Sequence, residues 1–210
     1  MSVEQVYDGL AVDALVAKVE AGQISEYVRS QYNACRGRLP NNIGLTDFAA
    51  KTSNWNPNKG GIGQKAQLHV LRRYDRHITK TKERGEGSIK LSKSNDGTTQ
   101  IIQSGLPSTI KGVKNFDAIR EYDDVIRLFV LKTIDIGTFS VSQGGGHQDN
   151  VAAEIDILAE HTRGKRFVFN GKRVEIVVLV DGRSGIIAKY ADYNSANFVV
   201  SNTDAFCQNH

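Results

Sequence analysis

Two residues in the central part of the chain have side chains of the types that hydrolyse a phosphodiester bond with a metal ion: Asp117 and Lys132. This reaction needs acidic oxygens that hold Mg²⁺ beside the scissile phosphate, and a nearby lysine that stabilises charge as water attacks. Asp117 and Lys132 flank the segment Glu121-Tyr122-Asp123-Asp124, where we expect the chain to reverse direction. Such a reversal places position 117 opposite 129 or 130, and therefore close to Lys132.

The elements that must position these residues follow from the hydrophobic pattern. Residues 112–120 and 125–136 have the pattern of two strands, and the second is largely apolar, as expected for a central strand buried on both faces. Residues 148–162 have helical periodicity, and 173–180 form a further apolar strand that ends at Asp181-Gly182. The order strand, strand, helix, strand predicts an α/β fold with a central mixed β-sheet flanked by helices.

The N-terminal part of the chain is expected to be helical and rich in loops. Apolar residues at helical spacing predict two short helices within 3–34, and Asn, Gly and Pro residues predict loops over 35–61. A helix is expected from Ile62, directly after a glycine pair. We therefore predict a single domain over 1–210, with a helical and loop region at 1–61 and an α/β core at 62–198.

A basic β-hairpin arm is predicted before the central strands. The run 88–94 alternates polar and apolar residues, Asn95-Asp96-Gly97 is a turn sequence, and 98–103 continues as a strand. Residues 72–93 contain eight basic and three acidic residues, in a chain of net charge +4. This density suits contacts with DNA phosphates, for which the candidates are Lys82, Arg84, Lys90 and Lys93. The alternative interpretation is a solvated helix face that continues into a loop.

The motif around Asp117 and Lys132 resembles that of the PD-(D/E)xK nucleases. In that superfamily an Asp on one strand is followed on the next strand by an acid, any residue and a Lys. The corresponding segments here are Phe116-Asp117 and Val130-Leu131-Lys132, so a valine occupies the place of the second acid. Some restriction enzymes of the superfamily keep the lysine and take the second carboxylate from the following helix. The resemblance therefore implies that Asp117 and Glu154 bind the metal, while Lys132 assists the attacking water.

The sequence that follows the strand pair is similar to the EcoRI group of type II restriction endonucleases. The similarity covers about residues 114–185 and includes Gly146-His147-Gln148-Asp149-Asn150 and the strand at 174–182. It implies Mg²⁺-dependent, sequence-specific cleavage of double-stranded DNA by a homodimer, because two active sites related by a two-fold axis match a palindrome. For such an enzyme we expect bases to be contacted by Gln148, Asp149 and Asn150 or by the basic arm at 84–98.

Each candidate residue also has a structural explanation. Asp117 can cap a turn or pair with Arg120. Lys132 can be a charge at a strand end, and Glu154 can be an exposed helix residue. On that interpretation the chain is a sequence-specific DNA-binding protein without hydrolytic activity, and the strand pair is scaffold. DNA cleavage by base removal, which needs no metal, is a third alternative without specific support in the sequence.

Other motifs argue against further classes of site. Gly144-Gly145-Gly146 lacks the following Gly-Lys-Ser/Thr of a phosphate-binding loop, which argues against nucleotide binding. His147 and His161 are far apart and lack the cysteine or further histidine neighbours of a zinc site. Asp123-Asp124 suits a turn, and Asp135 falls on the opposite strand face from Lys132.

Composition bounds the expected environment of the protein. Cys35 and Cys207 are too few for a disulfide framework and fit a reducing compartment. The N-terminal sequence lacks a basic region followed by an apolar run, and no stretch approaches the roughly 20 apolar residues of a membrane helix. We therefore expect a soluble, cytoplasmic protein.

Overall fold

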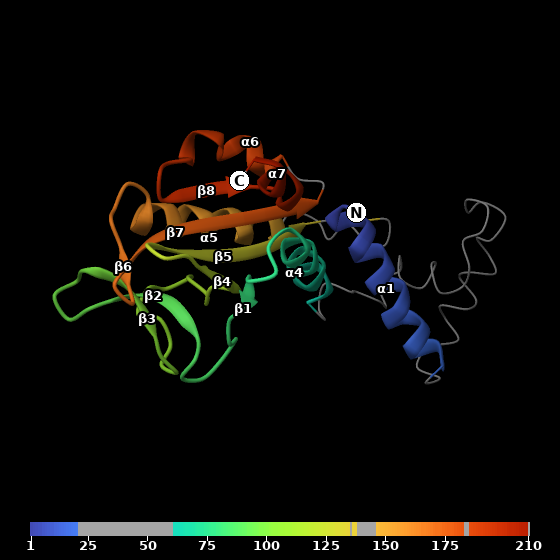
Figure 1. Cartoon of the computed structure of the whole chain (residues 1–210), viewed down its shortest axis with the longest axis horizontal. Helices are drawn as coiled ribbons and strands as arrows, with labels where there is room; N and C mark the ends of the chain where they lie inside the picture. The colour runs from blue at the N-terminus through green and yellow to red at the C-terminus, as the bar shows by residue number, and fades with distance from the viewer. Residues whose placement is uncertain (21–60, 135, 138–145, 183–184, 210) are drawn as a thin grey trace.

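The structure of the chain, a computed structural model, describes residues 1–20, 61–134, 136–137, 146–182 and 185–209. Helices flank a curled, mixed β-sheet, which confirms the predicted α/β class (Figure 1). In the described part of the chain, no helix combines the length and the apolar character that crossing a bilayer requires.

Six strands form the main sheet, in the order β1-β4-β5-β7-β6, with β8 also paired to β7. β4 runs antiparallel to both β1 and β5, whereas β5, β7 and β8 run parallel to one another. The strands are β1 Thr79–Lys80, β4 Ala118–Glu121, β5 Val125–Ile134, β6 Val168–Phe169, β7 Lys172–Gly182 and β8 Phe198–Ser201.

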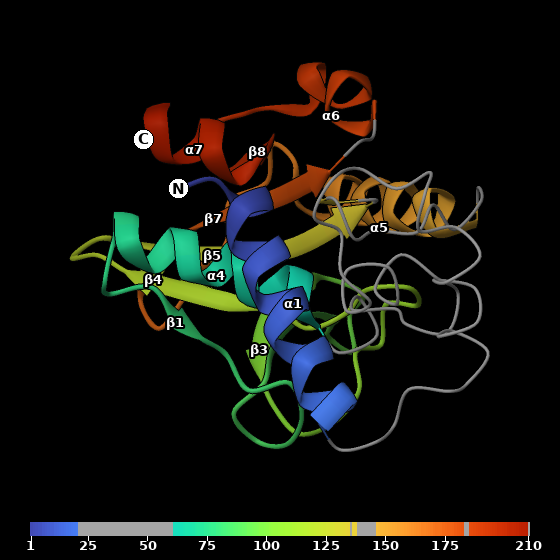
Figure 2. The same cartoon turned by 90° about the vertical axis from the view of Figure 1, so that its right-hand side faces the viewer.

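The two long strands β5 and β7 form the centre of the sheet because they are apolar on both faces. On one face they pack against α5 (Gly146–Thr162), through residues such as Val130 and Ile155. On the other face they pack against α4 (Ile62–Tyr74) and α7 (Thr203–Asn209), through residues such as Leu131 and Leu71. Figure 2 shows α5 on one side of the sheet and these two helices on the other. Burial on both faces explains the nearly continuous apolar sequence of β5.

Helix α1 (Val3–Glu20) packs on α4 rather than on the sheet (Figure 2). Val6 and Tyr7 of α1 meet Ile62 and Ala66 of α4 in a core cluster of their own. Between β7 and β8 lie the short helix α6 (Ile186–Lys189) and the 3-10 turn η3 (Ala191–Tyr193).

A second, two-stranded sheet is formed by β2 (Ile89–Lys93) and β3 (Thr99–Gln103). Gly97 in its turn has φ 82°, in the left-handed region that favours glycine. Leu91 and Ile101 belong to the main core cluster, so the hairpin packs against the domain. The predicted hairpin is present, but a basic arm is not confirmed, because Lys90 is buried and of the two β2 lysines only Lys93 is exposed.

Several predicted elements differ from the structure in extent. The first central strand begins at Ala118 rather than at 112, because the backbone N–H of Phe116 donates to Ile89 O of the hairpin at 2.9 Å. The second helix predicted within 3–34, the loops at 35–60 and Asp135 lie outside the described residues. The elements β1, β8 and α7 were not predicted.

Candidate active site

The three candidate catalytic residues line one cleft of about 1300 Å³. One wall is formed by the start of α4, the end of β5 and the first half of α5. The rest of the lining comes from residues within 83–90 and 105–117, which include the beginning of the hairpin. The chain reversal predicted between 121 and 124 occurs, with Ala118 opposite Phe129 in the β4–β5 register. Position 117 therefore lies next to β5 as expected.

Lys132 and Glu154 form an ion pair, with 2.9 Å between Lys132 Nζ and Glu154 Oε2. The side chains are 10% and 8% exposed. Lys132 lies two residues after Val130, on the face of β5 that packs against α5, and Glu154 comes from α5. Removing two charges from water costs free energy that their attraction only partly restores, so such a pair is weak evidence of a stabilising role. Its presence at a cleft favours a functional role.

Asp117 is held at the start of β4 by its backbone and its carboxylate. Its N–H donates to Phe129 O at 2.8 Å, and its carbonyl accepts from Thr81 N at 3.1 Å. Its carboxylate Oδ2 accepts from the backbone N–H of Leu131 at 2.7 Å. The carboxylate therefore lies at the strand segment that carries Lys132.

The electrostatic surroundings of Asp117 raise its pKa. Burial is the main cause and raises the pKa to about 6, against the lowering effects of the Leu131 N–H and the Lys132 ammonium. The carboxylate of Glu154 raises the pKa further, and Lys114 lowers it. A further positive charge beside Lys132 would favour the ionised forms of both carboxylates, those of Asp117 and Glu154.

A residue that the sequence did not single out, Gln64 of α4, contacts Asp117 directly. Its Nε2 donates to Asp117 Oδ1 at 3.3 Å and to Leu131 O at 3.2 Å. Three residues further along α4, Nε2 of Gln67 donates to Lys132 O at 2.9 Å. The spacing of three places both glutamines on one helix face, but only the tertiary structure shows what they contact.

Close contact between α4 and β5 depends on a glycine. A Cβ atom at Gly63 would lie 2.1 Å from Oγ1 of Thr133, so any side chain there would push the helix away from the strand. Gly61, which precedes the helix, has φ 69°. The glycine-rich sequence before Gln64 therefore sets its distance from Asp117.

The cleft carries more positive than negative side chains. Its basic residues are Arg84, Lys90, Lys114 and Lys132, and its acidic residues are Glu83, Asp117 and Glu154. Glu83 pairs with Lys80, and Glu154 pairs with Lys132. Lys114 was not among the predicted DNA contacts, whereas Arg84 and Lys90 were. Lys82 and Lys93, the other two predicted contacts, are exposed and do not line the cleft.

The residues expected to contact bases lie at the beginning of α5. Asn150 is exposed and lines the cleft. The side chains of Gln148 and Asp149 lie outside the described residues. His161, near the other end of α5, has its Nδ1 3.3 Å from Thr99 Oγ1, a polar contact rather than a metal site.

Two of the structural explanations for the candidate residues are wrong. Arg120 does not pair with Asp117, because its Nε donates to Asp75 Oδ2 instead. Glu154 is not an exposed helix residue, because only 7% of it is accessible. These contacts place both carboxylates in the cleft with Lys132.

The donor set fits a hard divalent cation with few protein ligands. The carboxylates of Asp117 and Glu154 supply the oxygen atoms that Mg²⁺ prefers. Among the described residues there is no group of three or more His, Cys, Asp or Glu side chains that could hold a metal. A metal here would therefore rely on two carboxylates, with water and substrate phosphate as further ligands, which is common for Mg²⁺.

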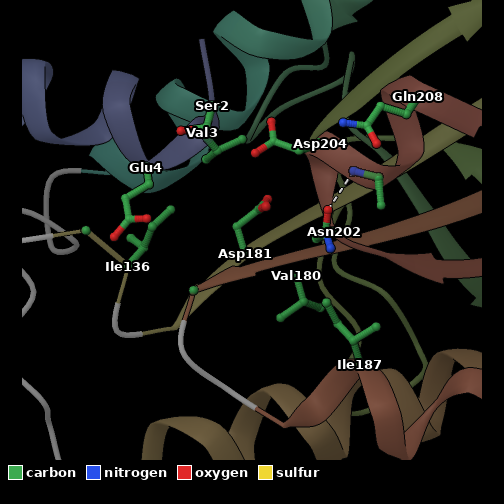
Figure 3. Close-up of a pocket in the computed structure, with 13 residues that line it drawn as sticks. Ser2, Val3, Glu4, Ile136, Val180, Asp181, Ile187, Asn202, Asp204 and Gln208 are labelled. Carbon is green, nitrogen blue, oxygen red and sulfur yellow. Dashed lines mark hydrogen bonds between the residues drawn. The ribbon is translucent and has the colours of Figure 1, made fainter.

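A second pocket, of about 520 Å³, lies near the end of β7, with Glu4, Asp181 and Asp204 around it (Figure 3). Asp181 is buried, and burial is the main cause that raises its pKa. Its Oδ2 accepts from Gln67 Nε2 at 2.7 Å and from Thr203 Oγ1 at 2.5 Å, and its Oδ1 accepts from Thr203 N at 3.2 Å. These bonds tie α7 to α4 and β7, so the role of Asp181 is structural.

Comparison with known proteins identifies no relatives. No family model matches the chain, and no curated protein and no solved structure is significantly similar to it.

Proposed function

We propose that the protein is a Mg²⁺-dependent type II restriction endonuclease that cleaves double-stranded DNA at a specific sequence. The observation that carries this proposal is the meeting of Asp117 with the Lys132–Glu154 ion pair in one cleft. These are the residue types that metal-assisted phosphodiester hydrolysis requires. The resemblance to the PD-(D/E)xK nucleases, with the second acid supplied by the helix, supports the same assignment.

Each residue has a distinct role in the proposed reaction. Asp117 and Glu154 hold the metal, which when bound polarises the scissile phosphate and lowers the pKa of water. The hydrogen bonds from Leu131 N and Gln64 Nε2 fix the carboxylate of Asp117 before substrate arrives. Lys132, which pairs with Glu154 at 2.9 Å, would orient the attacking water and stabilise the charge that develops on the phosphate.

The same proposal includes the mode of DNA binding. The excess of basic side chains in the cleft suits a polyanion, and Asn150 at the cleft edge suits contact with a base. Gln148 and Asp149 are further proposed base contacts, and Lys82 and Lys93 are proposed phosphate contacts outside the cleft. A homodimer in the cytoplasm would present two such sites to the two strands of a palindrome.

The experiment that tests the proposal is incubation of the purified protein with unmethylated phage DNA, with Mg²⁺ or with excess EDTA, followed by electrophoresis. Discrete fragments that appear only with Mg²⁺ are expected. Cleavage that persists in EDTA would contradict the metal-dependent reaction and support removal of bases instead.

One observation favours a second candidate function, a DNA-binding protein without hydrolytic activity. Lys132 and Glu154 neutralise each other without a metal, and the strand position of the second acid is filled by the buried Val130. For such a protein we expect no fragments in either condition, and a shift of the DNA band that weakens with salt and is indifferent to Mg²⁺.

A further inference from the structure

The lining of the cleft includes a buried lysine that the proposed mechanism does not use. Lys90 lies in β2 between Ile89 and Leu91, and all three residues are buried. Only 3% of Lys90 is accessible to solvent, yet it lines the cleft that contains Asp117 and Glu154. A lysine is rarely buried to this extent unless a partner of opposite charge accompanies it.

The ammonium of Lys90 has one hydrogen-bond acceptor within the described residues, the backbone carbonyl of Leu106. A lysine ammonium has three N–H donors and no acceptor. No carboxylate forms an ion pair with Lys90 in the described part of the chain. Burial of a cation without an anion is costly, so an anion that binds beside Lys90 would remove this cost.

The surroundings of Lys90 favour an anion from outside the protein. Arg84 and Lys114 also line the cleft and are exposed, and neither forms an ion pair with an acidic side chain among the described residues. The carbonyl that Lys90 contacts belongs to the segment Gly105–Ser108, in which Gly105, Pro107 and Ser108 also line the cleft. Because Lys90 itself lines the cleft, an anion that binds there can reach its ammonium.

We infer that Lys90 is the centre of a second phosphate subsite, which binds a substrate phosphate other than the one that is cleaved. The inference rests on the proposed function and adds to it a second point at which the substrate is held. A ligand that fills both the Asp117–Glu154 centre and the Lys90 subsite has at least two phosphates along a strand, so it is a polynucleotide rather than a single phosphodiester. Arg84 and Lys114 add positive charge at the edge of this subsite.

The test compares Lys90→Met with Lys165→Met in binding of a fluorescent DNA duplex, in EDTA and over a range of salt concentrations. Lys165 is a matched control because its ammonium also donates to one backbone carbonyl, that of Glu160, but the residue is exposed and outside the cleft. We expect Lys90→Met to weaken binding about 10-fold and to lower the slope of log K against log salt by about 1, as loss of one phosphate contact should. Lys165→Met should change neither quantity.

Melting temperatures separate a subsite from a structural role. Lys90→Met removes a buried, unneutralised charge while keeping a side chain of similar length, so we expect the melting temperature to stay equal or to rise. If the affinity for DNA and the melting temperature both fall, a second variant, Lys90→Arg, keeps the positive charge and tests the subsite. Restored binding with the wild-type salt slope supports the subsite. Persistent loss of binding overturns it. Wild-type affinity and slope in Lys90→Met would also overturn it. A wild-type protein that neither binds nor cleaves DNA would instead refute the proposed function.

Discussion

Asp117 and Asp181 are two buried aspartates with raised pKa values, each held by a glutamine of α4, yet their surroundings differ. The carboxylate of Asp181 accepts three hydrogen bonds, two of them from Thr203, and these bonds join α7 to the sheet. Asp117 accepts two hydrogen bonds and stands beside the Lys132–Glu154 ion pair at a cleft. Burial and a raised pKa are therefore shared by both aspartates, and the neighbouring charges and the cleft are what distinguish Asp117.

The sharpest test of this difference replaces each aspartate with asparagine. We expect Asp117→Asn to lower the rate of DNA cleavage about 10³-fold, because a metal ligand is lost while the shape of the site is kept. Asp181→Asn should leave the rate per folded molecule within about 3-fold of wild type. Both rates are measured on phage DNA with Mg²⁺. Equal losses in the two variants would remove the distinction between the two sites.

The ion pair beside Asp117 should affect the free energy of unfolding as well as the cleavage activity. Glu154→Ala leaves Lys132 as an unpaired buried cation, so we expect a loss of about 3 kcal/mol in the free energy of unfolding. The double variant Lys132→Met with Glu154→Leu should regain most of that stability and remain inactive. Urea denaturation measures both. Cleavage by the double variant would show that the pair is scaffold.

The two glutamines of α4 should differ in the same way as the two aspartates, with Gln67 important for stability and Gln64 for activity. Gln67→Ala leaves Lys132 O, Leu179 O and the carboxylate of Asp181 without this donor, so we expect a loss of about 2 kcal/mol in unfolding free energy. Gln64→Ala should cost less stability, since its contacts are partly solvated, and should lower kcat about 10-fold by loosening Asp117. Unchanged kcat in Gln64→Ala would contradict its role in positioning Asp117.

The raised pKa of Asp117 predicts an effect on the pH dependence of stability. The folded state favours the protonated form, so this contribution is present below the ordinary pKa of 3.8 and is lost as the pH rises through about 6. Its full size is about 3 kcal/mol. In EDTA, Asp117→Asn should show a smaller loss of unfolding free energy between those pH values than wild type does. Identical pH profiles would indicate that folding does not raise the pKa of Asp117.

Much of the fold was predictable because its central elements have strong local signals. The apolar runs of β5 and β7, the turn at Asn95-Asp96-Gly97 and the glycine pair before Ile62 each point to one structure. β8 and α7 were missed, since their four and seven residues are held mainly by tertiary contacts with β7 and with Asp181.

The candidate site was only partly predictable for a different physical reason. Asp117 and Lys132 are brought together by one short chain reversal, which sequence spacing can anticipate. The contact of Glu154 with Lys132 depends on how α5 packs on the sheet, and was inferred only from a family resemblance. Gln64 and Lys114 could not be predicted as site residues, because neither the spacing of a helical residue nor a single charge shows which residues it contacts in the folded protein.

The most direct measurement of the central claim, that Asp117 and Glu154 share a metal, is the rise in melting temperature that Mg²⁺ produces at matched ionic strength. A ligand that binds only the folded state must raise this temperature. We predict a rise for wild type and for Asp181→Asn, and none for Asp117→Asn or Glu154→Gln. An equal rise in all four proteins would contradict the proposed metal site.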